Sequence, residues 1–136
     1  MEIKFHSGLS GHSDADVLLH ALIDAIAGAL ALPDIGTLFP DTDPQFQNAD
    51  SGVLLKTILK KVKRWHWHIA QIDAILVCDQ PQLASHFPAM RSHLSRTLKI
   101  PFDRIGLKAK TTEGTFIALP KKSISALVIT LLVRPK

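Results

Sequence analysis

The sequence predicts an α+β fold of two layers, with one mixed sheet and helices on one face of it. The alternation of strand-like segments with helical ones predicts this class. The hydrophobic fraction of 46% is high for a chain of 136 residues and indicates that part of the apolar surface is buried between subunits. A chain of this length forms one domain most simply, which we place at residues 1–136. Because helices cover one face of the sheet, we expect another subunit to cover the other face.

The first third of the chain predicts a strand, a long helix and a loop. Glu2–His6 has the pattern of a short strand, and Ser7–Gly11 that of a turn rich in Gly and Ser. The helix runs from about Ser13 to Leu32, because the apolar segment stops at Pro33. Residues 34–44 are dense in Pro, Gly and Asp and are expected to form a loop.

The middle of the chain predicts a helix followed by a strand. Asp50 or Ser51 can cap the first turn of this second helix. Its apolar positions recur at helical spacing and are Val53, Leu54, Ile58, Leu59 and Val62. Ile69–Cys78 then predicts a strand.

The last third predicts a helix and two strands. Pro88 fits the first turn of the third helix, which ends at Ile100-Pro101. The inner face of this helix carries Met90, Leu94 and Leu98. Arg104–Lys110 predicts a strand, and the nearly continuous apolar run Ser123–Val133 predicts a buried strand.

Composition narrows the possible partners. The formal net charge of +4 and the pI near 9.4 favour an anion such as a phosphate or a nucleotide. No basic and aromatic strand motif indicates nucleic acid, and no apolar run is long enough to suggest a membrane partner. Cys78 is the only cysteine, which excludes an internal disulfide and a cysteine-based metal cluster. With no signal peptide in the sequence, we expect a cytoplasmic location.

A series of polar residues in the first helix is the clearest sign of a site. His12, Asp16, His20 and Asp24 follow one another at four-residue steps. Each step turns a helix by about 400°, so the side chains drift by only about 40° and form one stripe. Imidazoles and carboxylates among apolar residues are costly unless they are paired or bind a metal. The stripe indicates either a functional site or a solvated helix face.

Four segments of the chain carry a family resemblance. They are His12–Val17, His20–Ala25, Asp34–Pro44 and Lys108–Glu113, and Pro81, His86 and Pro88–Arg91 fall into register with them. Together they resemble the 2-C-methyl-D-erythritol 2,4-cyclodiphosphate synthase family. The joint match of HSDxDVxxHAxxDA, DIGxLFPDTDP and TTE is highly specific.

The resemblance implies a homotrimer whose active sites lie between neighbouring subunits. It also implies the lyase reaction of non-mevalonate isoprenoid biosynthesis. In that reaction 4-diphosphocytidyl-2-C-methyl-D-erythritol 2-phosphate cyclises to 2-C-methyl-D-erythritol 2,4-cyclodiphosphate and releases CMP. The 2-phosphate of the substrate attacks its own β-phosphorus, so the protein supplies positioning and charge neutralisation.

The resemblance also implies roles for individual residues. His12 and Thr111 would stabilise the transition state, His20 would bind Zn²⁺, and Glu113 would hold Mg²⁺ or Mn²⁺. Asp16 and Asp24 would support the metal ligands or contact substrate hydroxyls. The substrate-binding positions would be Ser13, Asp34, Ile35, Gly36, Phe39, Asp41, Asp43, Cys78, Pro81, Gln82, Leu83, Ala84, Lys110 and Thr112.

The sequence departs from the family pattern at three places. An Asp-x-His normally completes the zinc site, and the nearest text here is Lys4-Phe5-His6. His6 can replace the histidine, but the ammonium of Lys4 has no lone pair for a metal. The zinc site then lacks a ligand, is completed by water or phosphate, or is absent. Gly114–Ser123 lacks the family's arginine and glutamate, and Gln82 stands where a lysine is expected.

Two functions remain open on the sequence. One is an active cyclase with a rearranged metal site. The other is a catalytically impaired trimeric member of the family, which binds a cytidine nucleotide or acts as a scaffold.

Overall fold

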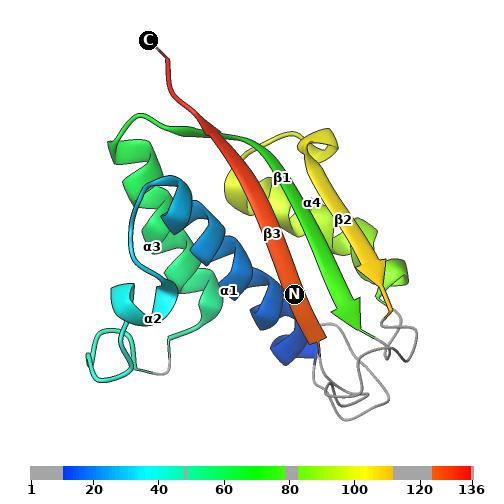
Figure 1. Ribbon diagram of the computed structural model, residues 1–136, viewed down its shortest axis with the longest axis horizontal. Helices are drawn as coiled ribbons and strands as arrows, with labels where there is room; N and C mark the ends of the chain where they lie inside the picture. The colour runs from blue at the N-terminus through cyan, green and yellow to red at the C-terminus, as the bar shows by residue number, and fades with distance from the viewer. Residues whose placement is uncertain (1–10, 48, 79–82, 112–123, 136) are drawn as a thin grey trace.

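The computed structural model describes residues 11–47, 49–78, 83–111 and 124–135 (Figure 1). In chain order the elements are α1 (Gly11–Ala29), α2 (Ile35–Leu38), α3 (Ser51–Arg64), β1 (His68–Cys78), η1 (Ala84–His86), α4 (Phe87–Leu98), η2 (Phe102–Arg104), β2 (Ile105–Lys110) and β3 (Ile124–Val133). The predicted strand Glu2–His6 lies outside the described residues. None of the described helices is both long and apolar enough to cross a membrane.

The strands form one mixed sheet, as predicted. Their order is β2-β1-β3, with β1 parallel to β2 and antiparallel to β3. Ala74 of β1 lies beside Leu107 of β2 and Val128 of β3, so these three side chains point to the same face. In Figure 1, α4 lies behind β1 and β2. The sheet therefore has one face covered by helices, which we call the covered face.

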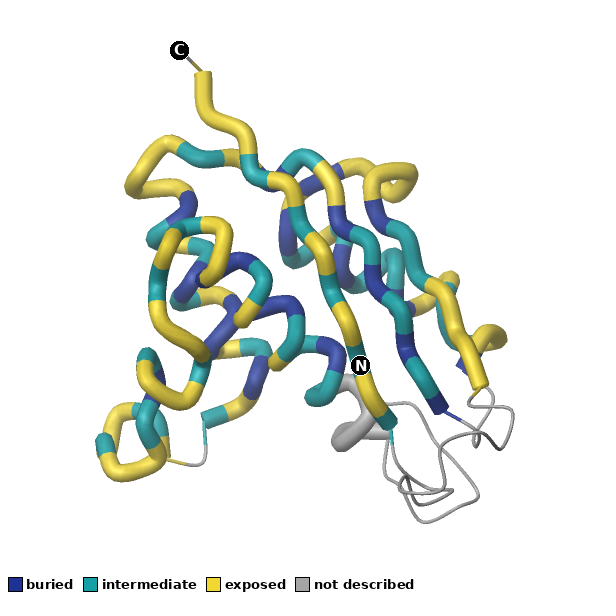
Figure 2. The backbone as a smooth tube through the Cα atoms, in the orientation of Figure 1, coloured by how far each residue is buried: buried dark blue, intermediate teal, exposed yellow. Residues whose placement is uncertain are grey.

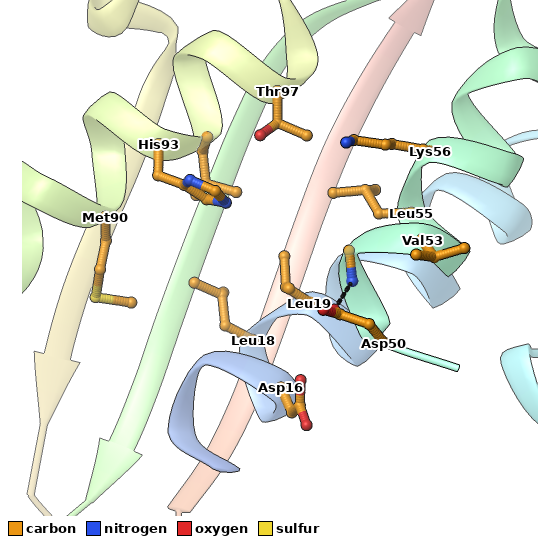
Figure 3. A pocket seen from close by; sticks show the side chains of 12 residues that line it. Asp16, Leu18, Leu19, Asp50, Val53, Leu55, Lys56, Met90, His93 and Thr97 are labelled. Carbon is orange, nitrogen blue, oxygen red and sulfur yellow. Dashed lines mark hydrogen bonds between the residues drawn. The ribbon is translucent and has the colours of Figure 1, made fainter. Parts of the chain in front are cut away.

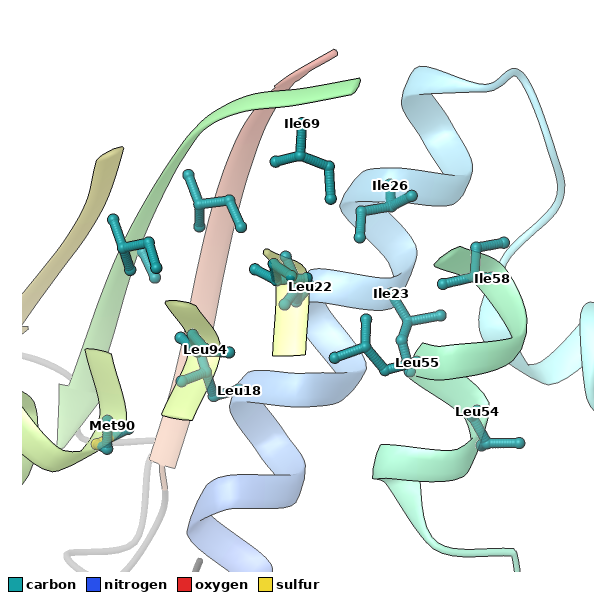
Figure 4. Close-up of a cluster of buried hydrophobic side chains, with 14 of the residues drawn as sticks. Leu18, Leu22, Ile23, Ile26, Leu54, Leu55, Ile58, Ile69, Met90 and Leu94 are labelled. Carbon is teal, nitrogen blue, oxygen red and sulfur yellow. The ribbon is translucent and has the colours of Figure 1, made fainter. Parts of the chain in front are cut away.

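The hydrophobic core fills the space between the covered face and the helices (Figure 4). Leu22 and Ile26 of α1 and Ile58 of α3 are at most 1% exposed. Ile72 and Leu76 of β1 are also 1% exposed. Burying a side chain of this kind contributes roughly 1.5–3 kcal/mol, so this layer supplies most of the stability that fixes the helices.

The prediction that β3 is buried is wrong for the described chain. The strand alternates between half-buried and exposed residues (Figure 2). Leu127, Ile129 and Leu131 are 61%, 67% and 57% exposed, because they point to the face without helices, which we call the open face. Val53 of α3 is likewise 55% exposed, so it is not a core position. A strand that is apolar on both faces therefore need not be buried on both faces within one chain.

Each of the helices α1, α3 and α4 is followed within two residues by a non-glycine residue in the left-handed conformation. Ala31, His66 and Lys99 have φ of 58°, 64° and 58°. After α1, the amide of Leu32 donates to the carbonyl of Ala27 at 2.8 Å, which closes the helix three residues before the predicted end at Leu32.

The open face also carries an ion pair next to its apolar residues. Lys108 of β2 contacts the Oδ1 atom of Asp73 on β1, and both side chains are about half exposed. Gly106 lies opposite Asp73 in the parallel pairing. A Cβ at position 106 would lie 2.8 Å from that Oδ1, so a larger residue there would require the carboxylate to move.

Candidate active site

His20 lies on α1 and contacts the first residue of α3. Its imidazole is exposed, and its Nε2 atom is 2.9 Å from the hydroxyl oxygen of Ser51. Ser51 itself is only 4% exposed. One ring nitrogen of His20 is thus engaged with the protein, which leaves the other for a ligand.

The next member of the stripe, Asp24, holds the loop that follows α1. Its Oδ1 atom accepts a hydrogen bond of 2.7 Å from the amide of Ile35, the first residue of α2. The loop predicted for residues 34–44 therefore contains one short helix. Asp34 caps this helix by accepting from the amide of Thr37 at 3.0 Å.

The carboxylate of Asp34 is favoured in its charged form. The side chain and the amide of Thr37 both donate to it, and these bonds hold its pKa below the ordinary value of 3.8. Ile35 is half-buried and Gly36 is exposed. At neutral pH the loop thus presents an ionised carboxylate beside an exposed glycine, which suits contact with sugar hydroxyls.

The remainder of this loop is anchored by aromatic packing. Phe39 is 7% exposed, and its ring meets that of Phe46 edge to face at 5.0 Å. Asp41 is exposed, and Asp43 is half-buried and accepts from the amide of Gln45 at 2.9 Å. Phe39 thus fixes the loop from inside, while Asp41 lies at its surface.

A second group of predicted residues lies at the carboxyl ends of the parallel strands. Cys78 is buried at the end of β1, and Lys110 and Thr111 are exposed at the end of β2. The pairing of Val77 with Lys110 brings these strand ends together. Leu83 is buried and Ala84 exposed just before α4. In Figure 1, the first turn of α1 lies at the same end of the molecule as these strand ends. α2 and β2 lie on opposite sides of α1.

Several predicted residues lie partly or wholly outside the described part of the chain. His12 and Ser13 belong to the first turn of α1, but their side chains are outside the described part. Outside it as well lie His6, Pro81, Gln82, Thr112 and Glu113. Among the residues that the structure describes, no three His, Cys, Asp or Glu side chains gather in a metal-binding group.

A pocket of about 280 Å³ lies between α1, α3 and α4 (Figure 3). Leu18, Leu55 and Leu94 contribute apolar walls, while Asp16 and His93 contribute polar groups. Burial lowers the pKa of His93 from its ordinary value of 6.5, with smaller contributions from cations that include Arg96 and Lys56. Among the described residues to which the sequence assigns a role in the site, Asp16 lines this pocket.

Comparison with known proteins identifies the family. The chain belongs to the YgbB family, whose model matches residues 1–133. It is 46% identical over 134 residues to the 2-C-methyl-D-erythritol 2,4-cyclodiphosphate synthase of Bordetella avium, a match that covers 98% of this chain and 83% of that protein. The protein of the same name from Geobacter sulfurreducens is 46% identical over 132 residues, covering 97% and 84%.

Solved structures agree with the sequence matches. A 2C-methyl-D-erythritol-2,4-cyclodiphosphate synthase in its CDP-bound form superimposes with a TM-score of 0.77 at 38% identity. The match covers 85% of this chain and 74% of that one. The α+β fold predicted from the sequence is therefore shared with enzymes of this kind.

Proposed function

We propose that this chain is a 2-C-methyl-D-erythritol 2,4-cyclodiphosphate synthase. It cyclises 4-diphosphocytidyl-2-C-methyl-D-erythritol 2-phosphate to the 2,4-cyclodiphosphate and releases CMP. The observation that carries this proposal is the 46% identity to synthases over nearly the whole chain. The same observation favours an active lyase over the catalytically impaired scaffold that the sequence had left open.

The chemistry asks the protein to position a substrate rather than to provide a nucleophile. The substrate phosphate attacks the β-phosphorus, and charge builds up on the phosphate oxygens in the transition state. We assign His12 and Thr111 to stabilising this charge and Ser13 to holding a phosphate. The ionised Asp34 and the exposed Gly36 would hold the ribose. Asp24 contributes indirectly, because it fixes the start of α2 beside them.

A divalent metal belongs to the same proposal. His20 is exposed, and its Nε2 is held by Ser51, as is typical of a histidine that binds a metal with its other nitrogen. Its imidazole suits Zn²⁺, which would polarise a phosphate oxygen as a Lewis acid. His6 as a further zinc ligand and Glu113 as the residue holding Mg²⁺ or Mn²⁺ stay predictions.

We further propose that the protein assembles as a homotrimer through the open face. The apolar residues of β3 on that face would lose their exposure to water in an assembly of this kind. The arrangement of the site supports the same idea. In Figure 1, α2 and the carboxyl ends of β1 and β2 lie on opposite sides of α1, and neighbouring subunits can combine the residues predicted on these segments. The expected cytoplasmic location, and the absence of nucleic-acid and membrane partners, stay predictions.

CMP release tests the proposed activity. Purified protein reconstituted with Zn²⁺ and Mg²⁺ is given the diphosphocytidyl substrate, and CMP and the cyclic diphosphate are quantified. We expect equal amounts of the two products, a loss of activity in His20→Ala, and wild-type activity in His68→Ala, which removes an exposed histidine of β1. Binding of CMP without any turnover would instead identify the impaired scaffold.

A further inference from the structure

Ser51 is a buried polar residue with a specific partner in the candidate site. It is 4% exposed, and its hydroxyl oxygen is 2.9 Å from Nε2 of His20. The two residues are 31 positions apart and lie on different helices. A buried hydroxyl needs a hydrogen-bond partner, and His20 provides one.

The helix start leaves this hydroxyl available. The side chain of Asp50 caps α3 by accepting from the amide of Gly52 at 2.7 Å. The carbonyl of Asp50 accepts from the amides of Val53 and Leu54. Ser51 therefore does not serve as the cap of its own helix, although its residue type and position suit that role.

Both partners stand on helices that the core holds in place. Ile23 of α1 is fully buried, and Leu55 and Ile58 of α3 are at most 1% exposed. Figure 4 shows these side chains meeting between the two helices. Because the helices are packed against each other, the distance between Ser51 and His20 is set by the core rather than by a flexible loop.

We propose that Ser51 is a positioning residue that selects which nitrogen of His20 binds the metal. The proposal rests on the metal role of His20 given under the proposed function. A neutral imidazole carries its proton on one nitrogen and a lone pair on the other. When Ser51 accepts the proton of Nε2, the lone pair is on Nδ1, and Nδ1 is the metal ligand. Partners of this kind typically change metal affinity about 10–100-fold when removed.

The test compares Ser51→Ala with a matched control, Ser95→Ala. Ser95 is half-buried and its hydroxyl is likewise engaged, donating a hydrogen bond of 2.6 Å to the carbonyl of Ile100, but it lies far along the sequence on α4. Zn²⁺ affinity is measured by competition with a chelator. We expect Ser51→Ala to weaken it by about 10–100-fold and Ser95→Ala to leave it within about twofold. Ser51→Thr, which keeps the hydroxyl, should recover most of the affinity.

A second measurement uses the protein without metal. In ¹⁵N NMR, His20 of the wild type should show its proton on Nε2, and Ser51→Ala should show a mixture of the two tautomers. Unchanged tautomers in Ser51→Ala, or unchanged Zn²⁺ affinity, would overturn the proposal. So would ligation of the metal through Nε2. If His20→Ala binds Zn²⁺ as well as the wild type, the metal role of His20 fails, whereas the tautomer measurement still reports on Ser51 alone.

Discussion

The two faces of the sheet are built from neighbouring residues of the same strands, yet they have opposite surroundings. On the covered face, Ile72, Ala74 and Leu76 are at most 1% exposed. On the open face, Leu127 and Ile129 are more than 60% exposed. Both sets are apolar, so the side-chain type alone does not distinguish the core of one chain from a surface that is expected to contact another subunit. This difference in exposure separates the residues that stabilise the folded chain from those that we expect to form contacts between subunits.

The largest effect on folding is expected on the covered side. Leu22→Ala removes a side chain that is 1% exposed and leaves a cavity, so the free energy of unfolding should fall by about 2–5 kcal/mol. Chemical denaturation followed by circular dichroism measures it. The matched control is Leu131→Ala on the open face, whose side chain is 57% exposed. In dissociated protein this control should change stability by less than about 0.5 kcal/mol. Equal losses in both variants would remove the distinction between the faces.

The open face is tested by placing a charge in it. Leu127→Lys puts an ammonium among the apolar residues of β3, opposite Ile75, and burying it between subunits would be costly. Analytical ultracentrifugation should show a trimer for the wild type and a monomer for the variant, with the helical circular dichroism signal retained. A variant that still forms trimers would show that this face is not the interface.

A smaller effect depends on pH and concerns His93 on the helical side. Its pKa is lowered chiefly by burial, so the folded state favours the neutral ring. The stability it contributes is fully present above its ordinary pKa of 6.5 and is lost as the pH falls toward its lower folded value. Unfolding measured from about pH 7.5 to about pH 5 should therefore show a weaker pH dependence in His93→Gln than in the wild type. The control His68→Gln should follow the wild type, and an unchanged slope in His93→Gln would contradict the prediction.

The smallest effect is expected at the ion pair of the open face. Asp73 and Lys108 are 45% and 48% exposed in the single chain, and pairs of this kind contribute about 0–1 kcal/mol. Asp73→Asn should therefore cost less than about 1 kcal/mol in dissociated protein. In the trimer the same change should cost more, because the open face is then removed from water. Equal costs in the dissociated and the trimeric protein would place the pair outside the interface.

The sequence predicted the fold well because prolines and apolar periodicity mark the elements locally. Pro33 follows the end of α1, Pro88 falls in the first turn of α4, and Asp50 caps α3 as one of the two expected residues. The predicted burial of β3 was wrong, because a run that is apolar on both faces has no alternation to reveal which one is open.

The candidate site was predicted less completely, because its supporting contacts join distant residues. From the sequence, Ser51 is expected only as a helix cap, which is what a serine at that position usually indicates. Nothing in the sequence relates it to His20, because the contact depends on how α1 packs against α3. The hydrogen bond from the amide of Ile35 to Asp24 cannot be predicted from the sequence either, because the donor is a backbone group that almost every residue type has. A polar stripe on one helix thus predicts a candidate ligand but not the residue that orients it.

The glycine at position 106 has a consequence for how related chains can vary. Its missing side chain is what admits the carboxylate of Asp73, which a Cβ would approach to 2.8 Å. The two positions lie on separate strands and are 33 residues apart, yet a larger residue at 106 would require the carboxylate of Asp73 to move. If Asp73 is replaced by a smaller residue during evolution, larger residues can be accommodated at position 106. If position 106 gains a side chain first, the carboxylate of Asp73 must move. Positions 73 and 106 should therefore change together when homologous sequences are aligned.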